Sequence, residues 1–402
     1  MAGALDGIRV VDLTTVVLGP WATQMLGDMG ADVIKVETHQ GDTTRHTGEK
    51  KNPKMASFFM MTNRNKRSII LDLRQQEGRD ALFKLVGTAD VFVHNMRPSV
   101  AAKLGLDDEK FMKAYPHLVY VKTYGYRSGA PQENQPAYDD IIQAASGLAD
   151  LQTIVSEGGH PRYLPTIAAD KAAAFHIVSG ALAGLLHKQR TGEGQVIEVP
   201  MFESLVDYVM VEHAGGAAFE PASGEMGYAR ILNSKRKPYQ TKDGYLAVLP
   251  YSDQNWDSVF RIAGREDLRD NPLFASLASR TKHSAEIYGV LEEIIATRTT
   301  EEWERDLNEA SVANQRVNTK EDLLNNEQLN ATDFWKFADH PTEGRIRMTD
   351  PPVRFSKSPN SIRRLQPLHG QHSEEVLAEA GYSQEEITAM LEARVTGGDK
   401  LS

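Results

Sequence analysis

Short runs of β-branched and other apolar residues alternate with helical segments through the first 125 residues of the chain. Strand-like runs occur at residues 8–13, 31–37, 68–73, 90–94 and 118–125. Between them, residues 20–29 and 75–86 have the apolar spacing of helices, and Pro20 and Gly30 suit the first turn and the end of the earlier one. Strands separated by helices imply right-handed crossovers and a largely parallel sheet. We therefore predict an α/β fold with a Rossmann-like large domain.

The loop after the first predicted strand lacks the glycine pattern of dinucleotide-binding proteins. It reads TTVVLGPWATQ, with Gly19 as its one glycine, and it contains no G-x-G-x-x-G. Those glycines let the backbone approach a pyrophosphate closely. We therefore expect neither NAD nor FAD. The predicted helix start at Pro20 and Trp21 could still attract another anionic group.

The composition narrows the classes of partner and compartment. The 402 residues include 45 Lys and Arg against 55 Asp and Glu, for a net charge of −10, which argues against nucleic acid or an anionic membrane as the main partner. The absence of cysteine excludes disulfides, thiolate metal sites and a cysteine nucleophile. The first residues do not read as a signal peptide, and the most apolar segment, 172–186, is too short to span a bilayer. We expect a cytoplasmic protein, and the histidine spacing indicates no metal site.

Changes in composition suggest the domain boundaries. Residues 199–233 are rich in Gly, Ala and Glu and read as a linker. After it, Lys242-Asp243-Gly244 reads as a hairpin turn between two strands, followed by helical patterns. We predict a large domain over residues 1–198, the linker, a small α+β domain over 234–330, and a C-terminal segment over 331–402.

One carboxylate, Asp170, directly precedes the strongest helix pattern in the chain. Residues 171–189 are rich in alanine and are followed by Gly192, a typical helix end. Apolar residues occur on nearly all sides of this helix, so we expect it to be buried. Gly180 and Gly184 would leave room for another backbone to pass close by.

Two roles are open for Asp170. Its position favours a helix N-cap, a common role worth about 1 kcal/mol. One carboxylate oxygen of a cap can still face a pocket while the other accepts a backbone N–H. The helix dipole and those N–H groups would keep Asp170 ionised, and an ionised carboxylate can attack an acyl group.

Other polar residues give weaker signals. Arg64, Lys66 and Arg67 precede a predicted strand and suit either phosphate binding or a solvated strand end. Asp139 is expected to cap a short helix, and His176 to be a hydrogen-bonded core residue. No G-x-S-x-G motif supports serine-hydrolase chemistry.

The order of these segments resembles the family III CoA-transferases, which include formyl-CoA and carnitine CoA-transferases. The resemblance covers most of the chain, and its motifs are specific in combination. The matching segments are LDGIRVVDLTTVVLGPWATQMLGDMGADVIKVE, residues 41–45, NRNKRSIILDL, ADVFVHNMRPSVAAKLGL, PAYDDIIQAASGL, the helix that begins at Asp170, RTGEGQVIEVPMFESL, PPVRFSKSP and PLHGQHSEEVLAEAGYS.

The resemblance implies a mechanism, substrates and an assembly. Asp170 takes the place of the family's nucleophile, which attacks an acyl-CoA thioester to form a mixed anhydride and then an aspartyl-CoA thioester. An acceptor carboxylic acid then carries the CoA away, so CoA thioesters are substrates and no cofactor stays bound. The family fold is an interlocked homodimer, in which the linker would form part of a ring and the C-terminal segment would return to the large domain.

The resemblance also implies the residues that contact CoA. Arg45 and Arg97 would be phosphate partners, and Lys103 stands where an arginine is frequent. The remaining predicted contacts are Val16, Leu71, Asp72, Asn95, Met96, Tyr124 and Tyr138.

Departures from the family pattern define the alternatives. The racemase branch has a histidine–aspartate pair where this chain reads PAYDDII, so a transferase is favoured over an acyl-CoA racemase. Val17 replaces a glutamine of the formyl-CoA branch, and no glycine-rich loop occurs around ARILNSKRKPYQ. A CoA-binding protein without catalysis, with Asp170 only a cap, is the third interpretation. Two interpretations remain open for a run of basic residues after the predicted linker begins: the run faces a dicarboxylate acceptor, or it forms a solvated hairpin arm. This run consists of Arg230, Lys235, Arg236 and Lys237.

Overall fold

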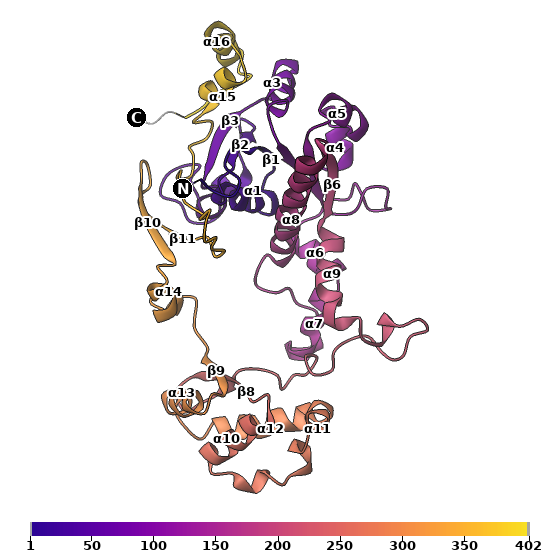
Figure 1. The fold of residues 1–402 in the computed structure, drawn as a ribbon, viewed down its shortest axis with the longest axis vertical. Coiled ribbons are helices and arrows are strands. Elements are labelled where there is room, and N and C mark those ends of the chain that lie inside the picture. The colour runs from indigo at the N-terminus through magenta and orange to yellow at the C-terminus, as the bar shows by residue number, and fades with distance from the viewer. Residues whose placement is uncertain (1, 400–402) are drawn as a thin grey trace. The chain divides into compact units, whose positions relative to one another are not determined.

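The computed structural model describes residues 2–399 of the chain. These residues form two compact units (Figure 1). Unit 1 contains the chain up to Leu148, Tyr163–Tyr208 and the residues from Ala331 onward, and unit 2 contains Ala149–Arg162 and Val209–Asn330. Each unit is built around its own sheet and its own core, so the two are described separately.

A six-stranded parallel sheet forms the centre of unit 1, in the order β3-β2-β1-β4-β5-β6. This is the Rossmann strand order, and it confirms the predicted α/β fold with a parallel sheet. The predicted strands are present with slightly shifted ends, whereas β6 was not predicted. The strands are β1 (Arg9–Leu13), β2 (Asp32–Glu37), β3 (Lys66–Ile70), β4 (Val91–His94), β5 (Val119–Tyr124) and β6 (Gln195–Pro200).

Helices cover both faces of this sheet. On one face, Val11, Ile34 and Phe92 belong to a core that also includes side chains of α3, α5, α15 and α16. On the other, α8 packs against β5, β6 and α1. The helices from the N-terminal part of unit 1 are α1 (Leu18–Asp28), α2 (Ser57–Thr62), α3 (Gln76–Val86), α4 (Pro98–Lys103), α5 (Asp108–Ala114), α6 (Asp139–Ala145) and α8 (Ala168–Thr191). Two further helices, α7 (Leu148–Leu151) and α9 (Met201–His213), have residues in both units.

The helix α8 is less buried than its composition predicts. Ala173, Ala174 and Ile177 are buried on one face, whereas Phe175 and His176 are exposed in the single chain. The prediction of a helix buried on all sides, with His176 in the core, is therefore wrong. Many of its apolar residues are alanines and glycines, and a small apolar residue does not by itself require burial.

The two glycines of α8 make room for side chains rather than for a backbone. A Cβ atom at Gly184 would lie 2.6 Å from Val119 Cγ1 of β5 and 2.7 Å from Ile197 Cδ1 of β6. At Gly180 it would lie 3.1 Å from Ile197 Cγ2. The expected close passage of another backbone is not found there, because the branched side chains of the sheet occupy that space.

The last part of the chain packs on the β3 edge of the sheet. The His372 N–H donates to Ser68 O over 2.9 Å, and the Thr396 hydroxyl donates to Ile70 O over 2.7 Å. The elements of this part are β10 (Trp335–His340), β11 (Gly344–Thr349), α15 (Ser373–Glu379) and α16 (Gln384–Glu392). The short helix α14 (Glu327–Ala331) precedes them and belongs almost wholly to unit 2.

Unit 2 combines a small antiparallel sheet with the helices α10 to α13. Tyr239 pairs with Leu246 across the turn at Lys242-Asp243-Gly244, which confirms the predicted hairpin. Trp303, Phe260 and Leu291 are among the residues of its core. The elements are β7 (Tyr239–Gln240), β8 (Tyr245–Leu249), β9 (Ala313–Arg316), α10 (Asp253–Ala263), α11 (Leu277–Lys282), α12 (Ser284–Ile295) and α13 (Thr300–Glu309).

Two features of the chain bear on its organisation. The helix α9 occupies the first part of the range whose composition suggests a linker. Within residues 2–399, no helix combines the length and the apolar character needed to cross a membrane.

Candidate active site

The candidate site lies where the strand order of the unit 1 sheet reverses, between β1 and β4. In open α/β sheets, ligands bind beyond the carboxyl ends of the strands at such a switch point. The loops after β1 and β4 are joined there by Asn95, whose Oδ1 accepts the Thr15 N–H over 3.1 Å and whose Nδ2 donates to Thr15 O over 2.8 Å. One amide side chain thus fixes the two loops that open the crevice.

A cavity of about 300 Å³ lies at this point. The structure brings seven of the predicted site residues together around it, from strand ends, loops and helices far apart in the sequence. These residues are Val16, Asn95, Met96, Arg97, Tyr124, Tyr138 and Asp170. Of the residues described, none that lines this cavity is a histidine, so a histidine–aspartate pair of the racemase kind is not found in it.

Asp170 is the third residue of α8 rather than its N-cap, which is Ile167. Its side chain is 5% exposed, and Oδ1 accepts the Leu18 N–H over 3.0 Å. Leu18 is the first residue of α1, so this N–H has no acceptor within its own helix. The predicted local cap is therefore wrong. The carboxylate instead links the N-termini of two helices that are 150 residues apart in sequence, counting from Leu18 to Ala168.

Asp139 supplies the cap that Asp170 was expected to provide. Its Oδ1 accepts the Ala169 N–H over 2.7 Å and the Asp170 N–H over 3.3 Å, both in the first turn of α8. Gln143 donates to Asp139 Oδ2 over 2.5 Å and accepts the Leu164 N–H over 2.9 Å, which fixes the chain before α8. The prediction that Asp139 caps its own helix α6 is wrong. Asp139 is the first residue of α6, and its Oδ1 accepts N–H groups of α8.

The surroundings of Asp170 favour its protonated form. Burial, together with the negative charge of Asp139, raises the pKa of Asp170 to about 6, against the lowering effect of the Leu18 N–H. The N–H groups of α8 do not act on Asp170 as expected, because Asp139 accepts those of Ala169 and Asp170, and the N–H that lowers the pKa comes from Leu18 of α1. At neutral pH the carboxylate is still ionised, and it is more basic than an exposed aspartate.

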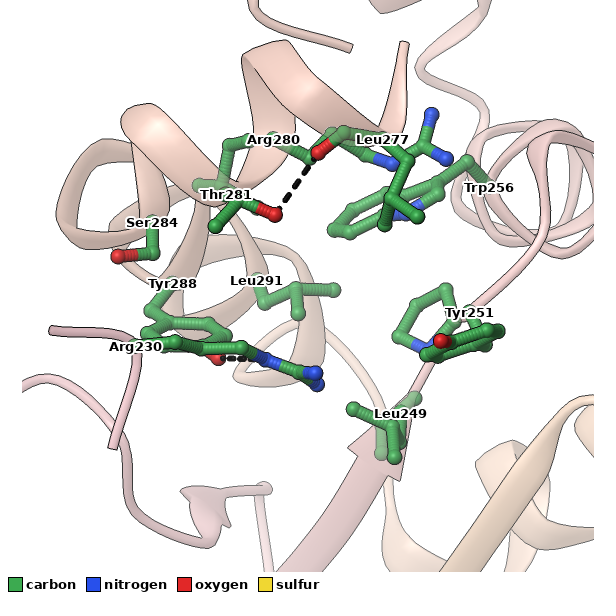
Figure 2. Close-up of a pocket in the computed structure, with 13 residues that line it drawn as sticks. Arg230, Leu249, Tyr251, Trp256, Leu277, Arg280, Thr281, Ser284, Tyr288 and Leu291 are labelled. Atoms are coloured by element: carbon green, nitrogen blue, oxygen red, sulfur yellow. Dashed lines mark hydrogen bonds between the residues drawn. The ribbon is translucent and has the colours of Figure 1, made fainter. Parts of the chain in front are cut away.

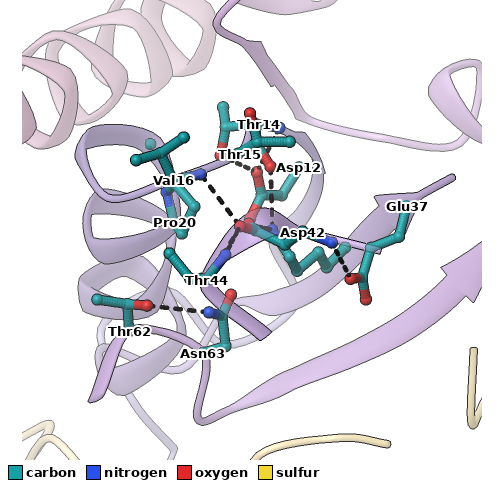
Figure 3. Close-up of polar contacts among 12 residues, drawn as sticks. Asp12, Thr14, Thr15, Val16, Pro20, Glu37, Asp42, Thr44, Thr62 and Asn63 are labelled. Carbon is teal, nitrogen blue, oxygen red and sulfur yellow. Dashed lines mark hydrogen bonds and ion pairs between the residues drawn. The ribbon is translucent and has the colours of Figure 1, made fainter. Parts of the chain in front are cut away.

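The loop that carries Leu18 rests on fully buried charged residues (Figure 3). We call them the Asp12 network. Its members are Asp12, Lys35, Glu37, Asp42, Arg45 and Lys66.

Two acids of this network bind the loop directly. Asp12 Oδ1 accepts the Thr14 N–H over 2.9 Å, and Asp42 Oδ1 accepts the Val16 N–H over 3.2 Å. Val16 has a φ of +73°, which is rare for a β-branched residue and which the surrounding structure must maintain. Gly19 is required by the same tight loop, since a Cβ there would lie 2.3 Å from Thr14 Cβ. The network thus holds the loop that presents the Leu18 N–H to Asp170.

Four predicted CoA contacts do not line the cavity. Arg45 is fully buried in the Asp12 network, where its Nε and Nη2 donate to Glu37 over 2.7 and 2.8 Å, so its guanidinium is not available to a phosphate. The Leu71 side chain is fully buried, and Asp72 accepts two hydrogen bonds from the Arg74 guanidinium and one from its backbone N–H. Lys103 is exposed at the end of α4.

The polar side chains that do line the cavity differ in whether they are held by hydrogen bonds or exposed. The Tyr124 hydroxyl donates to Glu198 over 2.5 Å, and burial with this contact raises the pKa of Tyr124. Tyr138 is 69% exposed, and Arg97 is exposed with one donor on Asn134 O. Tyr138 and Arg97 therefore remain free to meet a ligand, whereas Tyr124 is fixed. No group of three or more metal-binding side chains occurs in the part of the chain that is described.

Sequence reasoning missed three contributions to the site: the Leu18 N–H, the capping of α8 by Asp139, and the support of Val16 by Asp42. A backbone donor leaves no mark in residue identity, and the acids act on positions 26 and 31 residues away. Local spacing therefore carries no signal for any of them.

Comparisons with known proteins identify the family of the chain. The model of CoA-transferase family III matches residues 5–373. Succinyl-CoA:glutarate CoA-transferase of Mus musculus is 31% identical over 93% of this chain and 86% of its own length. Formyl-CoA:oxalate CoA-transferase of Escherichia coli O157:H7 is 28% identical over 97% of this chain and 99% of its own.

Solved structures show the same fold. Rv3272 from Mycobacterium tuberculosis superposes with a TM-score of 0.81 at 27% identity, covering 93% of this chain and 99% of that one. A CaiB/BaiF family protein from Brucella suis gives 0.79 at 28% identity, covering 94% and 100%. The match to the family model spans most of the chain, and the chain belongs to CoA-transferase family III.

Proposed function

We propose that the protein transfers CoA between carboxylic acids by covalent catalysis at Asp170. The observation that carries the proposal is a buried, basic carboxylate at the switch-point cavity, with one oxygen held by the Leu18 N–H. In the described part of the chain, Oδ2 accepts no hydrogen bond and is the oxygen left for attack. Acyl donors and acceptors of this class are carboxylic acids and their CoA thioesters, as the names of the relatives indicate.

In the first half of the reaction, Asp170 Oδ2 attacks the thioester carbonyl of the acyl-CoA. The C–S bond breaks, CoA leaves as the thiolate, and a mixed anhydride of Asp170 and the acyl group remains. The thiolate then attacks the Asp170 carbonyl carbon, which releases the first carboxylic acid and leaves an aspartyl-CoA thioester.

The second half reverses these steps with the acceptor. The acceptor carboxylate attacks the aspartyl thioester to form a new anhydride and CoA thiolate, and the thiolate then attacks the acceptor's acyl carbon. The new acyl-CoA leaves and the Asp170 carboxylate is restored. Two moderate acyl transfers thus replace a direct exchange between carboxylate and thioester.

The Leu18 N–H has a second role in this scheme. When a nucleophile attacks the Asp170 carbonyl, negative charge develops on the oxygen that this N–H already contacts. A preorganised donor at that position stabilises the tetrahedral intermediate. The fixed loop on the Asp12 network supplies the rigidity that this effect requires.

Within the cavity, the reactive end of CoA would meet Val16, Asn95, Met96 and Tyr138. Arg97 and Lys103 are the exposed cations proposed for the phosphates. Contacts of CoA with Leu71 and Asp72 stay predictions. An interlocked homodimer in the cytoplasm also stays a proposal, which size-exclusion chromatography with light scattering would test for its dimeric part.

The test of the proposed function is the intact mass of the protein after mixing with a panel of acyl-CoAs. We expect an adduct that maps to Asp170, that hydroxylamine converts to a hydroxamate, and that is absent from Asp170→Ala. Transfer activity of Asp170→Ala should fall at least about 1,000-fold, as for loss of other covalent nucleophiles. Asp207→Ala, an exposed acid on α9, is the matched control and should behave as wild type. Full activity of Asp170→Ala would contradict the proposal, and sustained exchange of the α-proton without an adduct would favour the racemase.

A further inference from the structure

Unit 2 contains a small pocket of about 40 Å³ between β8, α11 and α12 (Figure 2). We call it the Arg230 pocket. Leu249, Trp256, Leu277 and Leu291 give it apolar walls, and Arg230 directs its guanidinium toward the space beside Leu249 and Tyr251. No aspartate or glutamate lines it among the residues described.

The guanidinium of Arg230 is held in place by neutral groups. Its Nε donates to the Tyr288 hydroxyl over 3.2 Å, and the hydrogen bonds with Tyr288 and Tyr228 raise the pKa of Arg230. Within residues 2–399, no carboxylate forms an ion pair with it. The cation is thus oriented but not neutralised.

Neighbouring cations differ in this respect. Lys235 and Lys237 both pair with Glu292, over 3.4 and 2.7 Å. Arg280, the other arginine of the pocket, pairs with Asp253 over 2.7 Å and donates to Phe274 O over 2.8 Å. Of the basic run noted in the sequence, Arg230 is the member that lines the pocket. Arg230 is therefore the candidate for ligand binding, whereas Lys235, Arg236 and Lys237 lie outside the pocket lining.

The chemistry of the pocket selects the group it can take. The planar fork of a guanidinium matches the two oxygens of a carboxylate. A volume of about 40 Å³ has room for such a head group but not for a large ligand. One guanidinium without an ion-pair partner matches the single charge of a carboxylate, and the apolar side chains of the pocket suit a short hydrocarbon chain.

We propose that the Arg230 pocket binds the carboxylate group of a small organic acid. The identification of this acid as a substrate of the enzyme rests on the proposed function. A dicarboxylic acid with a short hydrocarbon chain is a suitable probe, because it offers the carboxylate that Arg230 would bind and a chain that suits the apolar side chains of the pocket.

The test measures binding of glutarate to the full-length protein by saturation-transfer NMR, with pentane-1,5-diol as the uncharged analogue. We expect saturable binding of glutarate and none of the diol. Arg230→Gln should weaken glutarate binding at least tenfold, and Arg230→Lys should weaken it less, because charge remains but the fork is lost. Arg236→Gln, an exposed arginine outside the pocket lining, is the matched control and should bind within twofold of wild type.

Thr281→Glu is a second variant, which places a carboxylate in the pocket lining beside Arg230 and should likewise weaken glutarate binding at least tenfold. Equal binding by wild type, Arg230→Gln and Thr281→Glu would overturn the inference, as would the absence of glutarate binding to wild type. The Asp170 adduct separates the two proposals. If glutarate binding depends on Arg230 and no adduct forms, the pocket stands and the proposed function fails. If the adduct forms and Arg230→Gln binds glutarate as wild type does, the proposed function stands and the pocket fails.

Discussion

Unit 1 contains two groups of buried carboxylates, and they differ in what surrounds them. In the Asp12 network, each acid has a cation within 3.0 Å, and all six side chains have an exposure of 1% or less. Around Asp139 and Asp170, the hydrogen bonds come from backbone N–H groups and the Gln143 amide instead. No ion pair to either acid is formed in the part of the chain that is described.

The difference appears in the proton affinities. Burial would raise the pKa of Asp12, but Lys66, Lys35 and hydrogen bonds from Thr14 and Thr23 lower it to about 2. Burial and Asp139 raise the pKa of Asp170 to about 6. Paired charges therefore build the scaffold, while an unpaired acid is kept basic where chemistry is proposed.

The largest expected effect is a loss of stability when one acid of the Asp12 network is neutralised. Asp12→Asn removes one charge and leaves Lys66 and Lys35 under-compensated in a fully buried site. We expect a loss of about 3–5 kcal/mol in the free energy of unfolding at pH 7, measured by urea denaturation. Asp6→Asn, an exposed acid in the same part of the chain, should stay within about 0.5 kcal/mol of wild type. Equal stability of the two variants would show that the network does not carry this stability.

Neutralising Asp170 is expected to raise the free energy of unfolding, whereas neutralising Asp12 lowers it. A carboxyl group whose pKa is raised by folding binds more protons folded than unfolded, so it lowers stability as pH rises from about 4 to 6. Asp170→Asn keeps an acceptor for the Leu18 N–H and removes the charge. We expect a gain of about 1–3 kcal/mol at pH 7.5 that shrinks at pH 4, measured by urea denaturation at both values. A loss of stability at pH 7.5 would contradict the assigned environment.

The smallest expected effect concerns the coupling between the two acids. The single-turnover rate of adduct formation should fall about tenfold per pH unit below a midpoint near 6, as Asp170 becomes protonated. Asp139→Asn retains a cap oxygen for α8 and removes the charge, so the midpoint should move down by about 0.5–1 unit. Asp140→Asn, the exposed neighbour, is the control and should leave the midpoint unchanged. An unshifted midpoint in Asp139→Asn would leave burial as the sole cause of the raised pKa.

Much of the fold could be predicted because its signals are local. The β-branched runs and the helix ends between them predicted five of the six parallel strands within a few residues. The strand β6 was not predicted; it contains Gln195 and Glu198 and its first four residues are only half-buried, so its apolar signal is weak. Exposure of Phe175 on α8 could not be predicted from a segment in which nearly every residue is small or apolar.

The candidate site could be predicted only in its residue types. Seven residues that the family resemblance implies do meet at one cavity. Arg45 was assigned to a phosphate, yet it lies in the core beside Glu37, and an arginine in a sequence looks the same in both places. Asp139 was assigned to its own helix, yet it caps α8.

The sequence by itself determined the alternation of strands and helices, the lack of a dinucleotide loop and the presence of an aspartate at the start of a long helix. These depend on residues close together in the chain, whose spacing is preserved in the sequence. Only the tertiary structure decided that Asp170 accepts the first N–H of α1 and that the negative charge of Asp139 lies close enough to raise the pKa of Asp170. It also decided that three buried acids and three buried cations neutralise one another beneath the loop. Each of these depends on distances of a few ångströms between residues far apart in the chain, because electrostatic and hydrogen-bond energies follow spatial distance rather than separation in sequence.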